Sequence, residues 1–91
     1  MQSARKMMCM NKLLVEIYVP SIGSVYDVII PYKARVFEIT HLITYAVEKL
    51  SNGLFVAKDV ALCDWVSGSI YDNNMSVEDM SLRNGSRLML I

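Results

Sequence analysis

Cysteine is scarce in this sequence, and histidine is scarcer. The 91 residues contain two cysteines, Cys9 and Cys63, and a single histidine, His41. Two cysteines do not make the disulfide framework of a small secreted domain. They form no CxxC motif and have no cluster of histidines beside them, which argues against a metal site. We therefore expect a chain of a reducing compartment that holds no metal and no other cofactor.

An excess of either charge is also lacking. Nine basic residues balance nine acidic ones, so no basic surplus is available to hold phosphates, which argues against nucleic-acid binding. There is no uninterrupted run of about 18 apolar residues, so we expect no transmembrane span. Arg5 and Lys6 precede an apolar stretch, as in a signal peptide, but Asn11, Lys12 and Glu16 interrupt it and no small-residue cleavage site follows. These features predict a cytoplasmic protein.

Apolar residues, by contrast, are abundant and make up 54% of the chain. A single domain of this length buries roughly 60–65% of its unfolded surface, so either its core is dense or some apolar surface is exposed for a partner. We expect a domain over residues 12–91, after a flexible N-terminal extension over residues 1–11. The extension is rich in methionine, so a docking tail is the alternative. Its methionines are also candidate native starts: Met1, Met7, Met8 and Met10.

Two strands are predicted in the first third of the domain. From Lys12 to Val19, apolar residues alternate with a second set, which is the period of a strand with one buried face. Residues 20–24 are rich in turn formers and suit a hairpin connection. Val25 to Ile30 is the returning strand, with Val25, Asp27 and Ile29 facing outward. Pro31 ends it.

The period changes to that of a helix between about Arg35 and Ser51. The predicted apolar stripe contains residues three and four apart: Val36, Ile39, Ile43, Ala46, Val47 and Leu50. The intervening positions, which include Thr40, His41 and Thr44, fall largely off that stripe. Asn52-Gly53 is a stop signal. The helix has no strong N-cap residue before it.

Shorter elements are expected after the helix. Val60 to Trp65 is a predicted third strand, and Ser69 to Tyr71 a short fourth one. Ser76 and Asp79 have the spacing of a capping box, which predicts a short helical turn. Asn84-Gly85 predicts a tight reversal. Arg87 to Ile91 is then a terminal strand in the middle of the sheet, paired with the first strand because the short turn before it cannot be its partner.

This order of elements is the β-grasp arrangement, an α+β fold in which a mixed sheet of four or five strands wraps around one main helix. The chain resembles ubiquitin-like proteins over about Lys12 to Ile91. The motifs that carry the resemblance lie mostly in the second half: Leu62-Cys63-Asp64, Gly68, Ile70 with Asp72, Met75 to Met80, Leu82, Asn84-Gly85 and Leu88-Met89-Leu90.

Within that superfamily the chain looks most like the YukD-like group of type VII (WXG100) secretion systems, found in Gram-positive bacteria. Members of that group open with a strand similar to Lys12 to Glu16 and close with one similar to Asn84 to Leu88. The resemblance implies a non-enzymatic adaptor that binds a protein partner, such as a membrane-anchored secretion component, and that takes no small-molecule substrate.

The alternative function is a ubiquitin-like covalent modifier or sulfur carrier. Such a protein needs a flexible tail ending in Gly-Gly, because its terminal carboxylate must reach an adenylating enzyme. This sequence stops at Ile91, inside a predicted strand. We therefore expect no such activity.

Three candidate catalytic groups have simpler structural explanations. Cys63 would need a base or a positive environment to lower its pKa, whereas Asp64 beside it would raise that pKa. His41 has no nucleophile or carboxylate assigned to it and suits a solvated helix face. Glu78-Asp79 suits a helix cap. Trp65 is either packed in a core or loop, or an anchor for a partner.

The outward face of the sheet is the candidate binding site. If Val15 and Ile17 point inward, a set of residues on neighbouring strands points outward: Leu14, Glu16, Tyr18, Ile29, Arg87 and Met89. We expect the apolar members to form one contiguous patch with a charged rim, which is typical of a protein–protein contact. Scattered apolar residues, coverage by the N-terminal extension, and coverage by a second copy of the chain in a homodimer are the alternatives.

Overall fold

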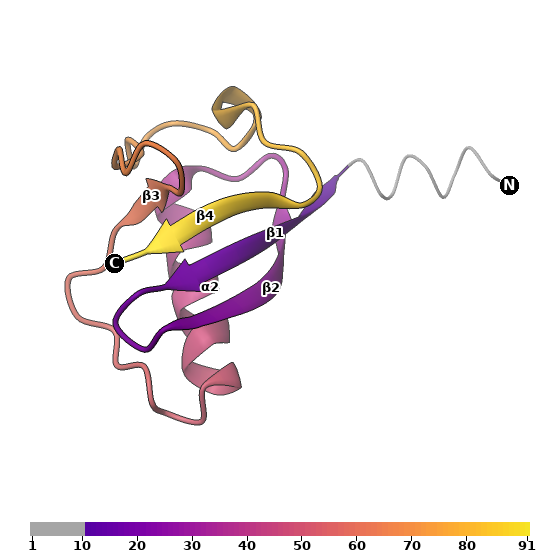
Figure 1. Cartoon of the computed structure of the whole chain (residues 1–91). Coiled ribbons are helices and arrows are strands. Elements are labelled where there is room, and N and C mark those ends of the chain that lie inside the picture. The colour runs from indigo at the N-terminus through magenta and orange to yellow at the C-terminus, as the bar shows by residue number, and fades with distance from the viewer. Residues whose placement is uncertain (1–10) are drawn as a thin grey trace, which may run out of the picture.

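The computed structural model describes residues 11–91 and shows one sheet with one long helix packed behind it (Figure 1). The element order is β1 (Lys12–Val19), β2 (Ser24–Pro31), α2 (Val36–Leu50), β3 (Leu62–Asp64), the 3-10 helix η1 (Glu78–Met80) and β4 (Ser86–Leu90). The sheet order is β2-β1-β4-β3. The extension expected over residues 1–11 lies, except for Asn11, outside the described residues.

The β1–β2 hairpin follows the predicted alternation. Val15, Ile17 and Val19 have no exposed surface. On β2, Val28 opposite Val15 and Ile30 opposite Leu13 are also buried. The strands are antiparallel. One side of the hairpin therefore contributes to the core, and its other side carries the residues predicted to point outward.

β4 lies in the interior of the sheet, between β1 and β3 (Figure 1). It pairs with β1 in parallel and with β3 antiparallel, and its Leu88 sits opposite Ile17 of β1. The Asn84-Gly85 turn is docked on the start of β1. The backbone N–H of Leu14 donates to Asn84 Oδ1 at 2.9 Å, and the N–H of Gly85 donates to the Leu14 carbonyl at 2.7 Å. The prediction of a central terminal strand is confirmed.

The helix α2 is confirmed, but its buried stripe differs from the predicted one. Leu50 is exposed, whereas Thr40 and Thr44 are buried. The buried face of α2 is therefore displaced around the helix axis toward Thr40 and Thr44, which lie one turn apart beside Ile39 and Ile43. The helix start is capped from within: the backbone N–H of the residue before it, Arg35, donates to Glu38 Oε1 at 2.9 Å. Arginine is not a preferred N-cap residue, so nothing in the sequence indicated this helix start.

The segment between α2 and β4 contains fewer strands than predicted. The third strand is limited to Leu62–Asp64, and the predicted strand over Ser69–Tyr71 is wrong, since only a single bridge joins Ile70 to Cys63. Four strands are therefore present. The turn at Ser76 does form: its Oγ accepts the N–H of Asp79, within the 3-10 helix η1, at 3.3 Å.

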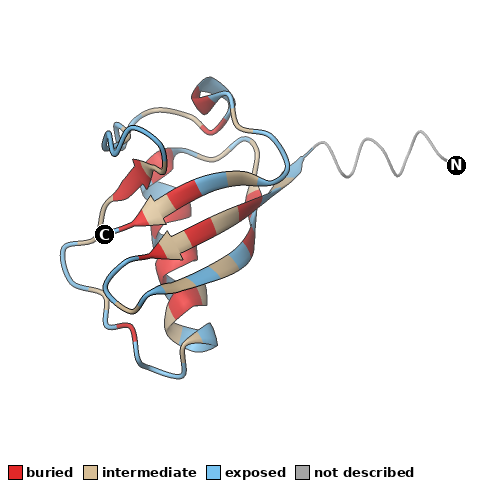
Figure 2. Ribbon diagram, in the orientation of Figure 1, coloured by how far each residue is buried: buried red, intermediate tan, exposed pale blue. Residues whose placement is uncertain are grey.

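The core lies between the sheet and α2, and the opposite side of the sheet carries none of it. Figure 2 shows buried positions alternating with exposed and intermediate ones along β1, β2 and β4. The core joins side chains from every element: Val15, Ile17, Val19, Val28, Ile30, Val36, Ile39, Ile43, Val47, Phe55, Leu62, Val77, Met80, Leu88 and Leu90. This arrangement confirms the β-grasp fold and leaves the other side of the sheet available for binding.

Candidate protein-binding face

The sheet surface turned away from α2, here called the outer face, carries all six residues predicted as a site. Strand register arranges them in rows that run across the strands. Leu14 is opposite Ile29 in the first row. Glu16 lies between Asp27 and Arg87 in the second row. The third row places Tyr18 between Val25 and Met89.

This register corrects the expectation of one contiguous apolar patch. The row of charged residues separates the Leu14–Ile29 pair from the group around Tyr18, so the charges lie across the centre of the face instead of around its rim. The reason is local: Glu16 and Asp27 are directly opposite one another in the hairpin, and the parallel pairing with β4 adds Arg87 to the same row. The outer face therefore presents its rows in the order apolar, charged, apolar.

Exposure is greatest along β2 and at the start of β1. Ile29 is 58% exposed, Val25 49% and Leu14 42%. Tyr18 and Met89 are half-buried. Val25 was not among the predicted site residues, although its alternation with Tyr26 already placed it outward. It extends the apolar group around Tyr18 to the edge of the sheet.

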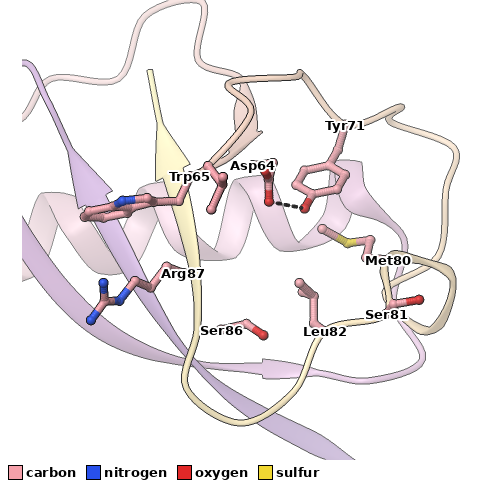
Figure 3. A pocket seen from close by; sticks show the side chains of 9 residues that line it. Asp64, Trp65, Tyr71, Met80, Ser81, Leu82, Ser86 and Arg87 are labelled. Atoms are coloured by element: carbon pink, nitrogen blue, oxygen red, sulfur yellow. Dashed lines mark hydrogen bonds between the residues drawn. The ribbon is translucent and has the colours of Figure 1, made fainter.

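Trp65 belongs to this face, which sequence reasoning left undecided. Its ring centroid lies 4.8 Å from that of Tyr18, with the planes inclined at 51°. The guanidinium carbon of Arg87 lies 5.7 Å from the centre of the Trp65 ring, and Figure 3 shows the two side chains next to each other. A cation at this distance is attracted to the face of the indole. Trp65 therefore packs on the outer face and holds Tyr18 and Arg87 in place.

The charged row contains one ion pair and one uncompensated carboxylate. Arg87 Nε lies 3.3 Å from Glu16 Oε1. Asp27 faces Glu16 across the hairpin, and it forms no ion pair within residues 11–91. Like charges directly opposite on neighbouring strands are destabilising. The row thus reads negative, negative, positive from the edge strand inward.

An open hollow of ≈ 470 Å³ adjoins the outer face at Trp65 and Arg87, and is lined on its far side by Asp64, Tyr71 and Leu82 (Figure 3). Asp64 is occupied in holding the loop that follows β3. Its Oδ2 accepts the N–H of Ser67 at 2.8 Å, and its Oδ1 accepts the Tyr71 hydroxyl at 3.3 Å. These hydrogen bonds, the Ser67 bond first, hold the pKa of the Asp64 carboxyl below its ordinary value.

The other residues considered for chemistry lie apart from one another. Cys63 is buried, and burial raises the pKa of its thiol. His41 is exposed on α2, behind the sheet. Asp79 belongs to the turn that Ser76 caps. Among the residues that the structure describes, burial is the only influence found on the pKa of the Cys63 thiol, and no base or cation lowers it.

Over residues 11–91 there is no group of three or more His, Cys, Asp or Glu side chains that could hold a metal ion. No helix in the same range is long and apolar enough to cross a membrane.

No family model matches the chain, and a search of the curated proteins finds no match. Solved structures do match. A chain of the MycP5-free ESX-5 inner membrane complex superimposes with a TM-score of 0.76 and 20% identity over 89% of this chain. The ubiquitin-like domain of the Mycobacterium tuberculosis type VII secretion system protein ECCD1 gives a TM-score of 0.69 and 16% identity, covering 88% of this chain and 97% of that domain.

The same fold also occurs outside secretion. A chain of the toluene 4-monooxygenase HD complex superimposes with a TM-score of 0.72 and 10% identity, covering 87% of this chain and 95% of that one. This chain spans 21% of the length of the ESX-5 membrane-complex chain that it matches. At these identities the likeness establishes a ubiquitin-like fold, and the function has to be argued from the outer face.

Proposed function

We propose that this chain is a non-catalytic, YukD-like adaptor of a type VII secretion system in a Gram-positive bacterium. It acts in the cytoplasm and binds a protein component of the secretion machine through its outer face. The observation that carries this proposal is the exposed Leu14–Ile29 pair beside the charged row. The structural likeness to the ubiquitin-like domain of a type VII secretion protein supports the choice of system.

The outer face has the composition expected of an interface. Leu14 and Ile29 offer adjacent apolar side chains whose burial would stabilise a complex, at about 25 cal/mol per Å² of apolar surface removed from water. Tyr18 and Trp65 offer half-buried aromatic rings, a residue type enriched at interface hot spots. Glu16 and Arg87, paired on the exposed surface, orient the partner more than they strengthen its binding.

The test is capture of the partner by tagged protein in the native cell. We expect a secretion component to be captured by the wild-type chain and lost with the Tyr18→Glu/Ile29→Glu double variant. The matched control is Tyr45→Glu/Leu54→Glu, because Tyr45 is 63% and Leu54 68% exposed, on α2 and just after it. Circular dichroism confirms that both variants fold. Equal capture by the wild type and the outer-face variant would contradict the site.

Boiling in detergent separates the adaptor function from covalent modification. A captured protein that is lost on boiling supports a non-covalent adaptor, whereas adducts that survive boiling support a ubiquitin-like modifier. A second copy of this chain is the remaining alternative occupant of the outer face. It predicts a dimer in sedimentation equilibrium that Tyr18→Glu/Ile29→Glu dissociates.

A further inference from the structure

The free edge of β2 exposes an unpaired row of backbone groups. β2 is the last strand on its side of the sheet, and no bridge joins it to anything but β1 within residues 11–91. The N–H of Tyr32 donates to the Asn11 carbonyl at 2.8 Å, which continues the β1–β2 register by one pair. In an antiparallel ladder the direction of the backbone groups alternates along the strand. Even-numbered residues of β2 therefore bond to β1, and odd-numbered residues point to the open edge.

The odd-numbered residues of β2 are Val25, Asp27, Ile29 and Pro31. The position of Pro31 agrees with this assignment, since a proline at an edge position removes no hydrogen bond from the ladder. The N–H and C=O groups of the other three, over a stretch of five residues, have no backbone partner among residues 11–91. The same three residues have their side chains on the outer face, so the open edge and the exposed apolar side chains coincide.

The charged row is left incomplete at this edge. Read inward from the edge it contains Asp27, then Glu16, then Arg87, and the 3.3 Å ion pair joins only the last two. The next position in the row, beyond Asp27, would belong to a strand added to β2. A cation there would compensate Asp27 and relieve its repulsion with Glu16. Opposite charges on neighbouring strands stabilise a sheet, as like charges destabilise it.

A second copy of this chain is poorly suited to the edge. Symmetric antiparallel pairing of two β2 strands about Asp27 places the two Asp27 carboxylates opposite each other, which is unfavourable. Shifting the pairing by two residues separates the carboxylates, but in either direction it leaves each Asp27 opposite an apolar residue, Ile29 or Val25, so that no cation compensates it. The edge therefore favours a different chain with a different central residue.

We infer that the free edge of β2 accepts an extended segment of the protein partner as a fifth strand, with lysine or arginine opposite Asp27 and apolar residues two positions to either side. The segment reads apolar, any, basic, any, apolar. Its backbone bonds to Val25, Asp27 and Ile29, and its apolar side chains continue the first and third rows of the outer face. This mode of recognition takes affinity from main-chain hydrogen bonds and specificity from alternate side chains.

This inference rests on the proposed function in one respect, that the outer face binds a protein. It adds where the partner's backbone lies and which charge it carries. The probe is a synthetic peptide, acetyl-Thr-Val-Thr-Lys-Thr-Val-Thr-amide, whose palindromic sequence presents the same pattern in either direction. The matched controls have glutamate in place of lysine, or an N-methyl group on the lysine nitrogen, which removes the hydrogen bond opposite Asp27.

The measurement is a two-dimensional ¹⁵N–¹H spectrum of the full chain, titrated with each peptide into the millimolar range. We expect the amide resonances of Val25, Asp27 and Ile29 to shift most. The glutamate peptide should bind roughly two- to fivefold more weakly, the range set by one cross-strand charge pair, and the N-methyl peptide more weakly still. In the Asp27→Lys variant the preference should reverse toward the glutamate peptide.

A second pair of variants tests the backbone separately from the side chain. Val25→Pro removes one N–H from the open edge and leaves the β1–β2 ladder intact, whereas Val25→Ala removes a comparable side chain and keeps the N–H. We expect Val25→Pro to bind the lysine peptide more weakly than Val25→Ala. Absence of shifts at the three residues, equal binding of all peptides, or the same shifts on raising the protein concentration alone would each overturn the inference.

Failure of this inference is distinguishable from failure of the proposed function. Both variants can be used in the capture experiment in the native cell. If the partner is lost with Tyr18→Glu/Ile29→Glu but not with Val25→Pro, it binds the outer face without adding a strand. That result retains the proposed function and overturns the fifth strand. Unchanged capture with both variants overturns the two together.

Discussion

Trp65 packs against Tyr18 with their ring centroids 4.8 Å apart, so a residue that follows β3 fixes an aromatic side chain on β1. The contact spans β4, which lies between those two strands in the sheet. Trp65 is the only tryptophan in the chain. Its fluorescence therefore reports on the outer face and on the hollow that adjoins it.

The Tyr18–Trp65 pair should contribute measurably to stability. Truncating Tyr18→Leu and Trp65→Leu together should be less destabilising than the sum of the two single changes, with a coupling of about 0.5–1.5 kcal/mol. The measurement is a double-mutant cycle of urea unfolding. Replacing Tyr18→Leu by Tyr45→Leu gives the control, since Tyr45 lies on α2 behind the sheet and its effect should add to that of Trp65→Leu.

Two buried threonines of α2 offer a matched test of hydrogen bonding. Within residues 11–91, Thr44 Oγ1 is buried without a hydrogen-bond partner, whereas Thr40 Oγ1 donates to the Val36 carbonyl at 2.8 Å. An unsatisfied buried hydroxyl costs about 1–3 kcal/mol. Thr44→Val should therefore raise the free energy of unfolding by about 1 kcal/mol, and Thr40→Val should leave it unchanged or lower it. Equal effects of the two changes would contradict this assignment.

The Asp64 carboxylate should make stability depend on pH in the acid range. Its hydrogen bonds from Ser67 and Tyr71 lower its pKa in the folded state, and the unfolded chain lacks those bonds. Stability from this group is therefore present above the ordinary carboxyl pKa of about 4 and is lost as pH falls through the lower folded pKa. The urea midpoint of the wild type should fall more steeply below about pH 4 than that of Asp64→Asn. Parallel pH curves for the two proteins would exclude this role.

The Cys63 thiol should be unreactive in the folded chain. It has no exposed surface, and burial raises its pKa, so little thiolate forms at neutral pH. In a Cys9→Ser variant, alkylation of Cys63 by iodoacetamide should be about two orders of magnitude slower in buffer than in urea, because reaction requires local opening. Rapid alkylation of the folded variant would instead support thiol chemistry at Cys63.

The two strands of the hairpin and the helix were predictable because each repeats a simple pattern. Alternation over Lys12–Val19 fixed both the strand and its buried face. The terminal strand followed from a conflict, since Asn84-Gly85 favours a hairpin but the short turn before it cannot supply a partner. Burial of Thr40 and Thr44 could not be predicted, because threonine counts as a polar residue in a sequence pattern. Its branched side chain nevertheless has the shape of valine and can be buried like one.

The candidate site was predictable as a set of residues but not as an arrangement. Outward positions follow from alternation within one strand, whereas their rows depend on the register between strands, which only the folded chain fixes. Asp27 and Glu16 became neighbours in this way. Trp65 could not be placed from sequence, because it lies after a strand of three residues and its orientation depends on contact with Tyr18.

The position of β4 between β1 and β3 has a consequence for synthesis on the ribosome. The β1–β2 hairpin and α2 emerge first, yet the side of β1 that β4 will occupy stays open until Leu90 has left the exit tunnel. That interval is of the order of seconds at typical rates of translation. During it, both edges of the β1–β2 hairpin are unpaired, whereas in the folded chain β4 covers the edge of β1 and only the edge of β2 stays open. Unpaired edges promote association between chains. The nascent protein therefore depends on rapid completion, or on a chaperone, to keep the edge of β1 free for β4.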